Sequence, residues 1–276
     1  MWVAESQYEV IGTRFGVRFD DPAVQGRLND LLAPFLQPNI VPVRAKQVFA
    51  LAASRPGDDR HHAYRDCTPI VRSESWTDVF DGLLAEINRQ AIHEMDHFGV
   101  HAGVVSTSTR TLAFPGASGA GKSTLVAACV AAGFEYVSDE ALCLAYPTGE
   151  VISYPKPLNF SRWSLEKLGI ELPGAEPVSD SRKTPVTVDH LGGAVASSPP
   201  GLSEVVFFER AAGPPRLEQV PPSRVVAGLL EFSFNHYRRP AEAFALTAKL
   251  ARSCAGWALS YDDPGDAASL MMTQFN

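Results

Sequence analysis

Residues 116–124 read Gly-Ala-Ser-Gly-Ala-Gly-Lys-Ser-Thr, and this stretch decides the fold that the sequence predicts. Residues 116–123 fit the pattern G-x-x-x-x-G-K-[ST] in full. The glycines allow the backbone to curl so that successive N–H groups point inward at phosphate oxygens. In such a loop the lysine places a cation at the β- and γ-phosphates, and the serine hydroxyl ligates Mg²⁺. The sequence therefore predicts a loop that binds ATP and Mg²⁺, with contacts from Gly116, Ala117, Ser118, Gly119, Ala120, Gly121, Lys122, Ser123 and Thr124.

The residues on either side of this loop have the patterns of a strand and a helix. The apolar residues 111–114 precede the loop and are typical of a buried strand. The amphipathic, alanine-rich residues 122–132 follow it and predict a helix. A helix that begins here directs the positive end of its dipole at the bound phosphates. The order strand, loop, helix therefore places the loop in an α/β domain.

Two neighbouring acids, Asp139 and Glu140, follow the next apolar stretch. Residues 134–137 predict a buried strand, so the two carboxylates come at its C-terminal end. Ligands for Mg²⁺ and general bases occupy this position beside a phosphate loop. Alternatively, Asp139 could serve only to cap the turn after the strand. We expect a catalytic and metal-binding pair, because adjacent carboxylates repel each other unless cations lie beside them.

The stretch His93-Glu-Met-Asp-His97 matches the H-E-x-x-H pattern of zinc proteases. On one helix the two histidines would lie one turn apart, with Glu94 as a base. A third ligand is missing at any familiar spacing, because His101 falls after Gly99, where we expect the helix to end. Histidines near a helix C-terminus are also favoured by the helix dipole. We therefore expect structural histidines here rather than a zinc site.

The segment of residues 101–140 resembles the catalytic domain of HPr kinase/phosphorylase and its relatives. In that family a histidine begins an H-G-V-L-V-like strand, a hairpin leads into the phosphate loop, and an A-D-D-like pair follows the loop helix. Here these places are taken by His101-Ala-Gly-Val-Val, by the glycine-rich loop and by Asp139-Glu140. The resemblance implies that His101 lines the catalytic pocket near the γ-phosphate, that Asp139 is the general base on a substrate hydroxyl, and that Lys122 is catalytic. The metal ligands that it implies are Ser123, Asp139 and Glu140.

The sequence departs from the family pattern in three places. The family's G-K-S-E is G-K-S-T here, with Thr124, and the second aspartate of the pair is Glu140. The later V-R-G-x-G-I-like signature does not occur. The chain is thus more similar to the divergent HPr-kinase-like proteins than to kinases of HPr itself. Such relatives are encoded beside peptide-modifying genes, including lasso-peptide pathways, where they phosphorylate a precursor peptide.

The resemblance and the pattern of the chain together predict an α/β fold with two domains. A P-loop kinase core of the HPr kinase/PEP carboxykinase type is expected over residues 98–276, after a smaller α+β domain over residues 1–97. A chain of 276 residues is long enough for both. The N-terminal domain is expected to bind substrate or to mediate oligomerisation. Relatives in this family commonly assemble, so the resemblance implies a homo-oligomer.

Several further elements follow from periodicity and from cap and turn residues. One helix begins at Asp20-Asp-Pro22 and is expected to run to about Phe35, and another begins at Ser75 and is expected to stop at Gly99. The other predicted elements are strands at 8–11, 15–19, 41–43, 47–53, 100–106 and 204–208, a hairpin of 141–145 and 151–154, and helices at 161–168, 223–234 and 241–256, the last two finishing the chain.

The composition argues against several classes of protein. The net charge of −7 disfavours a general nucleic-acid binder, because phosphate backbones call for clustered Lys and Arg. The longest apolar run, residues 125–134, is far shorter than the roughly 20 residues of a membrane helix. No basic region followed by an apolar one marks a secretory signal, and the scattered cysteines contain no C-x-x-C pair. We therefore expect a cytoplasmic protein with reduced thiols and no membrane partner.

These observations predict an ATP- and Mg²⁺-dependent kinase that transfers the γ-phosphate to a hydroxyl, in our expectation a serine, of a peptide or protein such as a natural-product precursor. Two alternatives stay open: a small-molecule hydroxyl kinase, which differs only in its acceptor, and a nucleotide-binding regulatory protein without transfer activity. An ATPase motor is disfavoured because no L-S-G-G-Q-like motif occurs. A further cation would complete the phosphate site, and the candidates, with Lys183 preferred, are Lys156, Arg162, Arg182 and Lys183.

Overall fold

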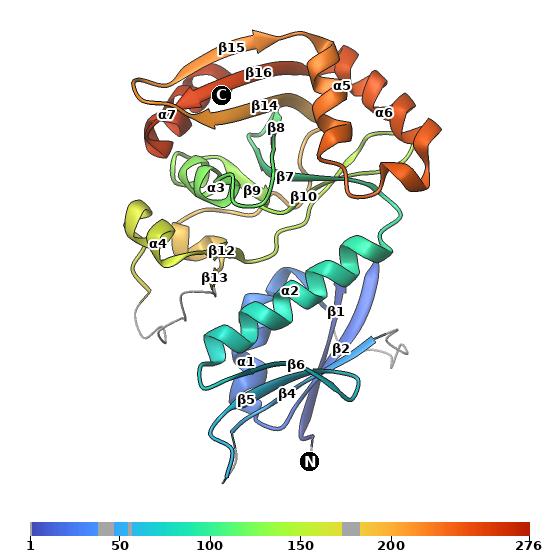
Figure 1. Ribbon diagram of the computed structural model, residues 1–276, viewed down its shortest axis with the longest axis vertical. Helices are drawn as coiled ribbons and strands as arrows, with labels where there is room; N and C mark the ends of the chain where they lie inside the picture. The colour runs from blue at the N-terminus through green and yellow to red at the C-terminus, as the bar shows by residue number, and fades with distance from the viewer. Residues whose placement is uncertain (1, 38–46, 55–56, 173–182) are drawn as a thin grey trace. The chain divides into compact units, whose positions relative to one another are not determined.

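The structure is a computed structural model that describes residues 2–37, 47–54, 57–172 and 183–276. The protein is mixed α/β and divides into two compact units (Figure 1). Unit 1 comprises Met1–Met95 and Lys156–Thr187, and unit 2 comprises Asp96–Pro155 and Val188–Asn276. The expected boundary after residue 97 lies close to the first division between the units. Residues 156–187, which we expected in the C-terminal domain, group with unit 1 instead.

Unit 1 is built on a six-stranded sheet with the order β3-β1-β2-β4-β5-β6. β2 and β4 run parallel, whereas the other neighbouring strands are antiparallel. The strands predicted at 8–11, 15–19 and 47–53 are confirmed, and the one predicted at 41–43 lies outside the described residues. The sequence did not predict β5 and β6. The strands are β1 (Ala4–Val10), β2 (Thr13–Phe19), β3 (Leu36–Gln37), β4 (Gln47–Ala52), β5 (His61–Arg65) and β6 (Thr68–Ser73).

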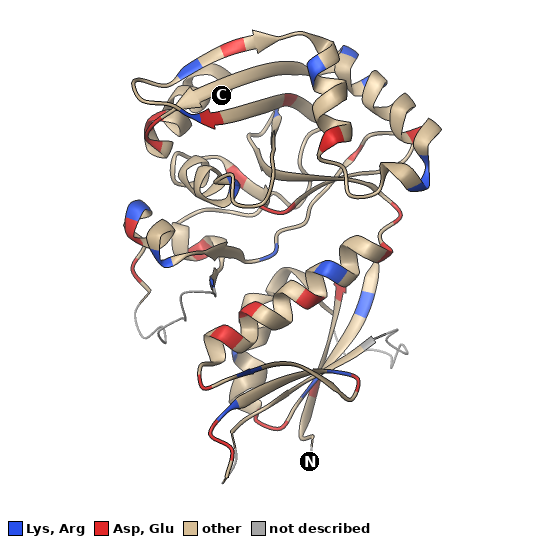
Figure 2. Cartoon of the chain, viewed as in Figure 1, with Lys and Arg blue, Asp and Glu red and all other residues tan. Residues whose placement is uncertain are grey.

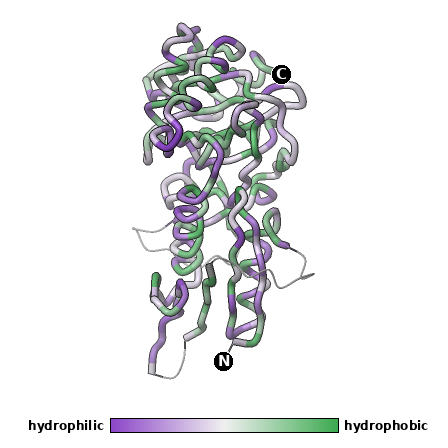
Figure 3. The backbone as a smooth tube through the Cα atoms, turned by 90° about the vertical axis from the view of Figure 1, so that its right-hand side faces the viewer, coloured by the Kyte–Doolittle hydropathy of each residue, from purple (hydrophilic) through white to green (hydrophobic). Residues whose placement is uncertain are grey.

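One face of this sheet is apolar and packs against the helices α1 (Pro22–Leu31) and α2 (Trp76–Glu94). Buried and more exposed residues alternate along β1 and at most positions of β2, so these side chains point in turn to the helices and away from them. Figure 3 shows hydrophobic and hydrophilic residues interleaved along the chain. The opposite face carries cross-strand ion pairs on β1 and β2. Each large apolar side chain buried in this way contributes roughly 1.5–3 kcal/mol. The inward side chains include Tyr8, Phe15, Val17, Phe19, Phe49, Leu51, Ala63 and Val71.

The ends of the two helices follow from their cap residues. The Asp21 carboxylate accepts the Ala23 N–H at 2.9 Å at the start of α1, which confirms the predicted cap. The α-helix ends before the predicted Phe35, because Pro34 has no N–H to continue it, and η1 (Ala33–Phe35) is a 3₁₀ turn. α2 begins after Ser75 as predicted but ends at Glu94. The predicted stop at Gly99 is wrong, because the backbone is already extended at Met95.

A second piece of chain completes unit 1. β12 (Leu158–Phe160) and β13 (Thr184–Val186) form a two-stranded antiparallel sheet. β13 contacts α2, which explains why this stretch groups with the first unit. Between the two strands, α4 (Arg162–Leu168) confirms the helix predicted at 161–168.

Unit 2 contains an eight-stranded sheet with the order β11-β10-β7-β8-β14-β16-β15, in which β9 also pairs with β7. β14 runs parallel to both β8 and β16, and the other pairs are antiparallel. The strands predicted around the glycine-rich loop, the predicted hairpin and the strand at 204–208 are confirmed. The bounds are β7 (Phe98–Ser106), β8 (Thr111–Pro115), β9 (Glu135–Ser138), β10 (Ala141–Leu144), β11 (Val151–Ile152), β14 (Leu202–Arg210), β15 (Arg216–Val220) and β16 (Ala255–Tyr261).

Helices cover both faces of this sheet. α5 (Pro222–Glu231) and α6 (Pro240–Ser253) pack on the face that carries the even-numbered residues of β7. On the opposite face α3 (Lys122–Ala131) packs against β7, and α7 (Pro264–Phe275) packs against α3. A Cβ atom on Gly103 would lie 2.5 Å from Cγ2 of Val126. A glycine at this position of β7 therefore allows the helix that follows the glycine-rich loop to approach the sheet closely.

The prediction that two helices finish the chain is wrong. The predicted helices at 223–234 and 241–256 correspond to α5 and α6, but β16 and α7 follow them. α7 begins with Pro264, and the Asp263 carboxylate caps it by accepting the Gly265 N–H at 2.8 Å. The remaining short elements are η2 (Val188–Leu191) and η3 (His236–Arg238).

The described residues add three general features. No helix among them combines the length and the apolar character that crossing a membrane requires. Lys and Arg positions are scattered among Asp and Glu positions in both units (Figure 2). Three of the four free cysteines are buried, and burial raises the pKa of the Cys143 thiol to about 12 and that of Cys254 to about 11. These two thiols therefore stay protonated at neutral pH.

Replacing Gly103 with alanine should destabilise unit 2 by about 1–3 kcal/mol, because the added methyl group overlaps Val126 on α3. Denaturant unfolding of the full chain measures this loss. Gly201→Ala is the matched control, since nothing lies within 4 Å of the added Cβ and its φ is not positive. We expect the control to change the free energy of unfolding by less than about 0.5 kcal/mol. Equal stabilities of the two variants would contradict the close approach.

Candidate functional site

The site predicted from the sequence lies in unit 2, where the neighbours of β7 change on both of its edges. On the first edge β8 pairs with residues 102–106. Just beyond this pairing, the Gly116 N–H donates to the His101 carbonyl at 3.1 Å. The glycine-rich loop therefore leaves the sheet beside His101.

On the second edge of β7, β9 pairs with residues 104–106 and β10 pairs with residues 98–101. The chain passes from β9 to β10 through Asp139 and Glu140. At this crossing the Ala102 N–H donates to the Glu140 carbonyl at 3.3 Å. The acid pair thus leaves the sheet at the same point along β7 as the glycine-rich loop, which brings two separate sequence motifs together.

The glycine-rich loop curls through two left-handed residues into the start of α3. Gly119 has φ 81° and Gly121 has φ 101°, a region that L side chains rarely adopt. Residues 117–120 are exposed. Gly121 is the N-cap of α3. Among the described residues, no side chain accepts a capping hydrogen bond from the N-terminus of this helix. The backbone N–H groups of the first turn and the positive end of the helix dipole therefore face this loop.

Lys122 lies inside the curl of the loop. Its side chain is buried, with a relative exposure of 6% for the residue. The ammonium donates to the carbonyl oxygens of Gly116 at 2.9 Å and Ala117 at 2.8 Å. A buried ammonium needs such partners, because removing an unpaired charge from water costs several kcal/mol. The loop therefore holds a positive charge at its centre.

Ser123 and Asp139 join the first turn of α3 to the end of β9. The Ser123 hydroxyl donates to Oδ2 of Asp139 at 2.8 Å, and the Tyr136 hydroxyl donates to Oδ1 at 3.3 Å. Burial, with the nearby Asp139 charge, raises the pKa of Tyr136 well above its usual value, so the phenol keeps its proton. Asp139 itself is only 4% exposed. A hydroxyl and a carboxylate at this separation are hard oxygen ligands of the kind that Mg²⁺ prefers.

Glu140 and His101 form a more accessible pair beside this cluster. Nε2 of His101 lies 3.7 Å from Oε1 of Glu140, and their side chains are 20% and 27% exposed. Tyr154 lies buried nearby, and burial followed by the charges of Glu140 and Asp139 raises its pKa well above its usual value. The two neighbouring acids therefore occupy different environments: Asp139 is buried between hydroxyl donors, and Glu140 is paired with a histidine and reachable from solvent.

The structure thus connects most of the predicted site residues through direct contacts. Ser118, Gly119 and Ala120 form the exposed part of the loop, and Thr124 is buried in α3. Sequence reasoning missed Tyr136, because alternation along β9 places residues 136 and 139 on opposite sides, and only the turn after the end of β9 brings Asp139 to the Tyr136 hydroxyl. It also missed the segment 232–235, which contacts β7 at His101 and of which residues 232–234 fall in the predicted helix 223–234. No local pattern marks that segment as part of a site.

The alternative zinc site loses its geometric basis. His93 lies in α2, but His97 lies beyond the end of that helix, so the two are not one turn apart on it. In the part of the chain that the structure describes, no three His, Cys, Asp or Glu side chains group as metal ligands would.

The four candidates for an additional cation at the site stay predictions. Arg182 lies outside the described residues. The other three belong to unit 1. Lys156 is buried and donates to the Pro157 carbonyl at 3.2 Å, whereas Arg162 pairs with Glu166 on the surface of α4. The Lys183 preference stays a prediction.

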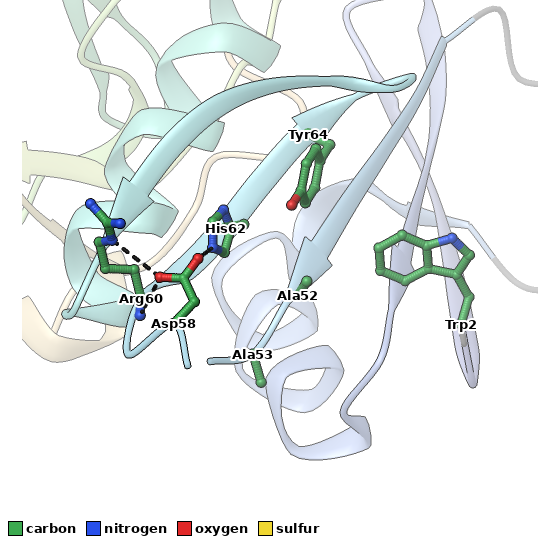
Figure 4. A pocket seen from close by; sticks show the side chains of 7 residues that line it. All are labelled: Trp2, Ala52, Ala53, Asp58, Arg60, His62 and Tyr64. Carbon is green, nitrogen blue, oxygen red and sulfur yellow. Dashed lines mark hydrogen bonds and ion pairs between the residues drawn. The ribbon is translucent and has the colours of Figure 1, made fainter. Parts of the chain in front are cut away.

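Unit 1 has a pocket of about 310 Å³ of its own (Figure 4). The Asp58 carboxylate lies at one end, bonded to Arg60, His62 and Arg72 at 2.9–3.2 Å. Hydrogen bonds from Arg60, Arg72 and His62 hold the pKa of Asp58 well below its usual value. This network holds the Asp58 carboxylate in its ionised form, so Asp58 is not poised to accept a proton in this pocket. Its lining residues are Trp2, Ala52, Ala53, Asp58, Arg60, His62 and Tyr64.

No protein-family model and no curated protein matches this chain.

Replacing Tyr136 with phenylalanine should make the stability of the protein less sensitive to alkaline pH. The raised pKa of Tyr136 means that above about pH 10 the unfolded chain releases a phenolic proton that the folded protein retains. The free energy of unfolding therefore falls as pH rises through this range. In the variant, the slope of the unfolding free energy against pH should be smaller by the contribution of about one proton. Urea unfolding at a series of alkaline pH values measures it. Tyr237→Phe, at a residue that is 66% exposed, is the control and should keep the wild-type slope; equal slopes in all three proteins would contradict the assignment.

Proposed function

We propose that the protein is an ATP- and Mg²⁺-dependent kinase of the HPr-kinase-like type, with its phosphate-binding loop in unit 2. It transfers the γ-phosphate to a hydroxyl, for which we favour a serine of a peptide or protein. One observation carries the proposal: the glycine-rich loop, with Lys122 inside it, meets the acid pair 139–140 at a single point of β7. A phosphate loop and carboxylates at one place are the parts that phosphoryl transfer requires.

The loop supplies the groups that hold polyphosphate. Its backbone N–H groups and the N-terminus of α3 offer donors and a positive dipole to an anion. Lys122 adds a full positive charge, and the two carbonyl oxygens that now accept its protons are in the loop itself. In the proposed complex, phosphate oxygens take the place of these two carbonyl oxygens as partners of the ammonium. We therefore assign binding of the β- and γ-phosphates to the loop and Lys122.

Ser123 and Asp139 are the candidates to hold Mg²⁺ together with the phosphates. Their oxygens lie 2.8 Å apart, and Mg²⁺ is usually bound by one or two protein oxygens plus substrate phosphates and water. When bound, the ion neutralises charge that develops on the transferred group. Tyr136 keeps Asp139 in place by its hydrogen bond to the second carboxylate oxygen.

We assign acceptance of the substrate proton to Glu140 rather than to Asp139. The sequence led us to expect this role for Asp139, but both of its oxygens accept hydroxyl protons and the residue is 4% exposed. Glu140 is more exposed and lies beside His101, which can stabilise the carboxylate or relay the proton. A general base must reach the proton that it removes, and this favours Glu140.

The chemical step then balances as follows. The acceptor oxygen forms a bond to the γ-phosphorus, while the bond between that phosphorus and the bridging oxygen of ADP breaks. The hydroxyl proton passes to Glu140 and from there to solvent. Lys122 and the loop N–H groups stabilise the negative charge on the phosphoryl oxygens.

The proposal includes the location and the assembly of the protein. A reaction with cellular ATP fits the cytoplasm, where we place the protein. We also expect the protein to form a homo-oligomer.

Lys122→Ala should abolish transfer of labelled γ-phosphate and weaken ATP binding. The test incubates the full chain with Mg²⁺ and labelled ATP, together with Ser-, Thr- and Tyr-containing peptides and small hydroxyl metabolites. Labelling that depends on Lys122 identifies the class of acceptor, and we expect peptides. A Lys249→Ala variant, which makes the same change at an exposed lysine of α6, is the control and should label at the wild-type rate. ATP bound tightly without any labelled acceptor would overturn the kinase proposal in favour of a regulatory nucleotide-binding protein.

Two isosteric substitutions separate the roles of the acids. Glu140→Gln should lower kcat by about 100-fold or more, because it removes the proton acceptor, and should leave the Mg²⁺ requirement unchanged. Asp139→Asn should instead raise the Mg²⁺ concentration needed for half-maximal rate. Steady-state kinetics over a Mg²⁺ series distinguishes the two effects. The reverse pattern would return the proton-accepting role to Asp139.

A further inference from the structure

The residues that follow α5 do not leave unit 2 but run along the first edge of β7. The His101 N–H donates to the Phe232 carbonyl at 2.8 Å, and the Phe234 N–H donates to the Gly99 carbonyl at 2.9 Å. Val100 and Ser233 form an antiparallel bridge between these bonds. The segment 232–235 therefore replaces β8 as the partner of β7 on the side of His101 away from the glycine-rich loop.

Asn235 fixes this segment with its side chain. Its amide oxygen accepts the Gly99 N–H at 3.1 Å, and its amide nitrogen donates to the His97 carbonyl at 2.8 Å. The residue is 5% exposed, so these bonds are shielded from water. The Ser233 hydroxyl oxygen accepts the N–H groups of Asn235 and His236 at 3.2 and 3.0 Å and holds the turn in shape. An amide side chain here supplies the hydrogen bonds that a strand would otherwise make.

Phe234 brings the segment into contact with the candidate catalytic pair. Its ring centroid lies 5.4 Å from that of the His101 imidazole, with the planes inclined by 39°. The imidazole therefore has an aromatic neighbour in addition to the Glu140 carboxylate at 3.7 Å. Backbone and ring contacts from one short segment thus restrict both the main chain and the side chain of His101.

We propose that Phe234 and Asn235 are positioning residues that hold His101 toward Glu140 for proton transfer. The proposal rests on the proposed kinase function. Neither side chain needs to touch substrate: Asn235 fixes the backbone on which His101 lies, and Phe234 limits the rotation of its ring. Groups that lock a catalytic side chain in place matter because a displacement of about 1 Å can cost about 100-fold in rate.

The kinetic test uses Phe234→Leu and Asn235→Ala in the full chain. Both should lower kcat by about 10- to 100-fold and leave the KM for ATP unchanged, since neither residue contacts the loop. Phe244→Leu is the matched control, because it makes the same change at a residue of α6 that is 60% exposed, and it should keep the wild-type kcat. Asn235→Asp retains the oxygen that accepts the Gly99 N–H but sets a second oxygen against the His97 carbonyl, so it should not recover the loss seen with alanine.

A double-mutant cycle with His101→Ala separates positioning from a general loss of stability. If Phe234 acts through His101, Phe234→Leu should have no further effect on kcat once His101 is alanine. Losses that multiply in the double variant would overturn the proposal, because Phe234 would then act independently of the imidazole.

A spectroscopic readout decides the question without activity. In the wild type the Phe234 ring current should shift the His101 imidazole proton resonances, because the two ring centroids lie 5.4 Å apart, and Phe234→Leu should move the resonances toward those of an exposed histidine. Phe244→Leu should leave them in place. Unchanged resonances in Phe234→Leu would overturn the positioning role. An absence of transfer to any acceptor, with shifted His101 resonances, would contradict the kinase function while retaining the structural contact.

Discussion

The main chain of His101 and Ala102 is the constraint on which the candidate site depends. The His101 N–H and C=O bind the segment after α5 and the start of the glycine-rich loop, respectively. The Ala102 N–H binds the carbonyl of Glu140 on the opposite edge. Three segments that are far apart in the sequence therefore meet at one point of β7 through main-chain hydrogen bonds. These bonds do not depend on side-chain identity, so the geometry is set by the sheet and the chemistry by the residues that it presents.

This arrangement explains how neighbouring acids come to have different environments. Asp139 turns toward α3 and contacts Ser123 and Tyr136, whereas Glu140 pairs with His101 on β7. A buried carboxylate between hydroxyl donors suits an ion and a fixed position, and an accessible one beside a histidine suits proton transfer. Close packing of α3 on Gly103 keeps the helix that carries Lys122 and Ser123 against the strand that carries His101.

The sequence predicted best where a local pattern has one physical meaning. The G-x-x-x-x-G-K-S loop, its strand and helix, and the capped start of α1 at Asp21-Pro22 all follow from contacts within a few residues. The equivalent Asp263-Pro264 start of α7 carries the same signal and was overlooked, because the preceding helix was expected to end the chain.

Long-range contacts set the limit of prediction for the rest. Asn235 bonds to Gly99 from 136 residues away, and no periodicity encodes such a pairing. The grouping of residues 156–187 with unit 1 likewise depends on β13 meeting α2. Gly99 suggested a helix stop because glycine is common there, whereas in the fold it accepts the Phe234 N–H within β7.

A crystal structure of the full chain with Mg²⁺ and a non-hydrolysable ATP analogue tests the central claim most directly. We predict that the β- and γ-phosphates lie within the loop 116–123 and that the Lys122 ammonium contacts them in place of the Gly116 and Ala117 carbonyl oxygens. The same structure should place Mg²⁺ against Ser123 and Asp139. A nucleotide bound elsewhere, with Lys122 still on the loop carbonyls, would contradict the account.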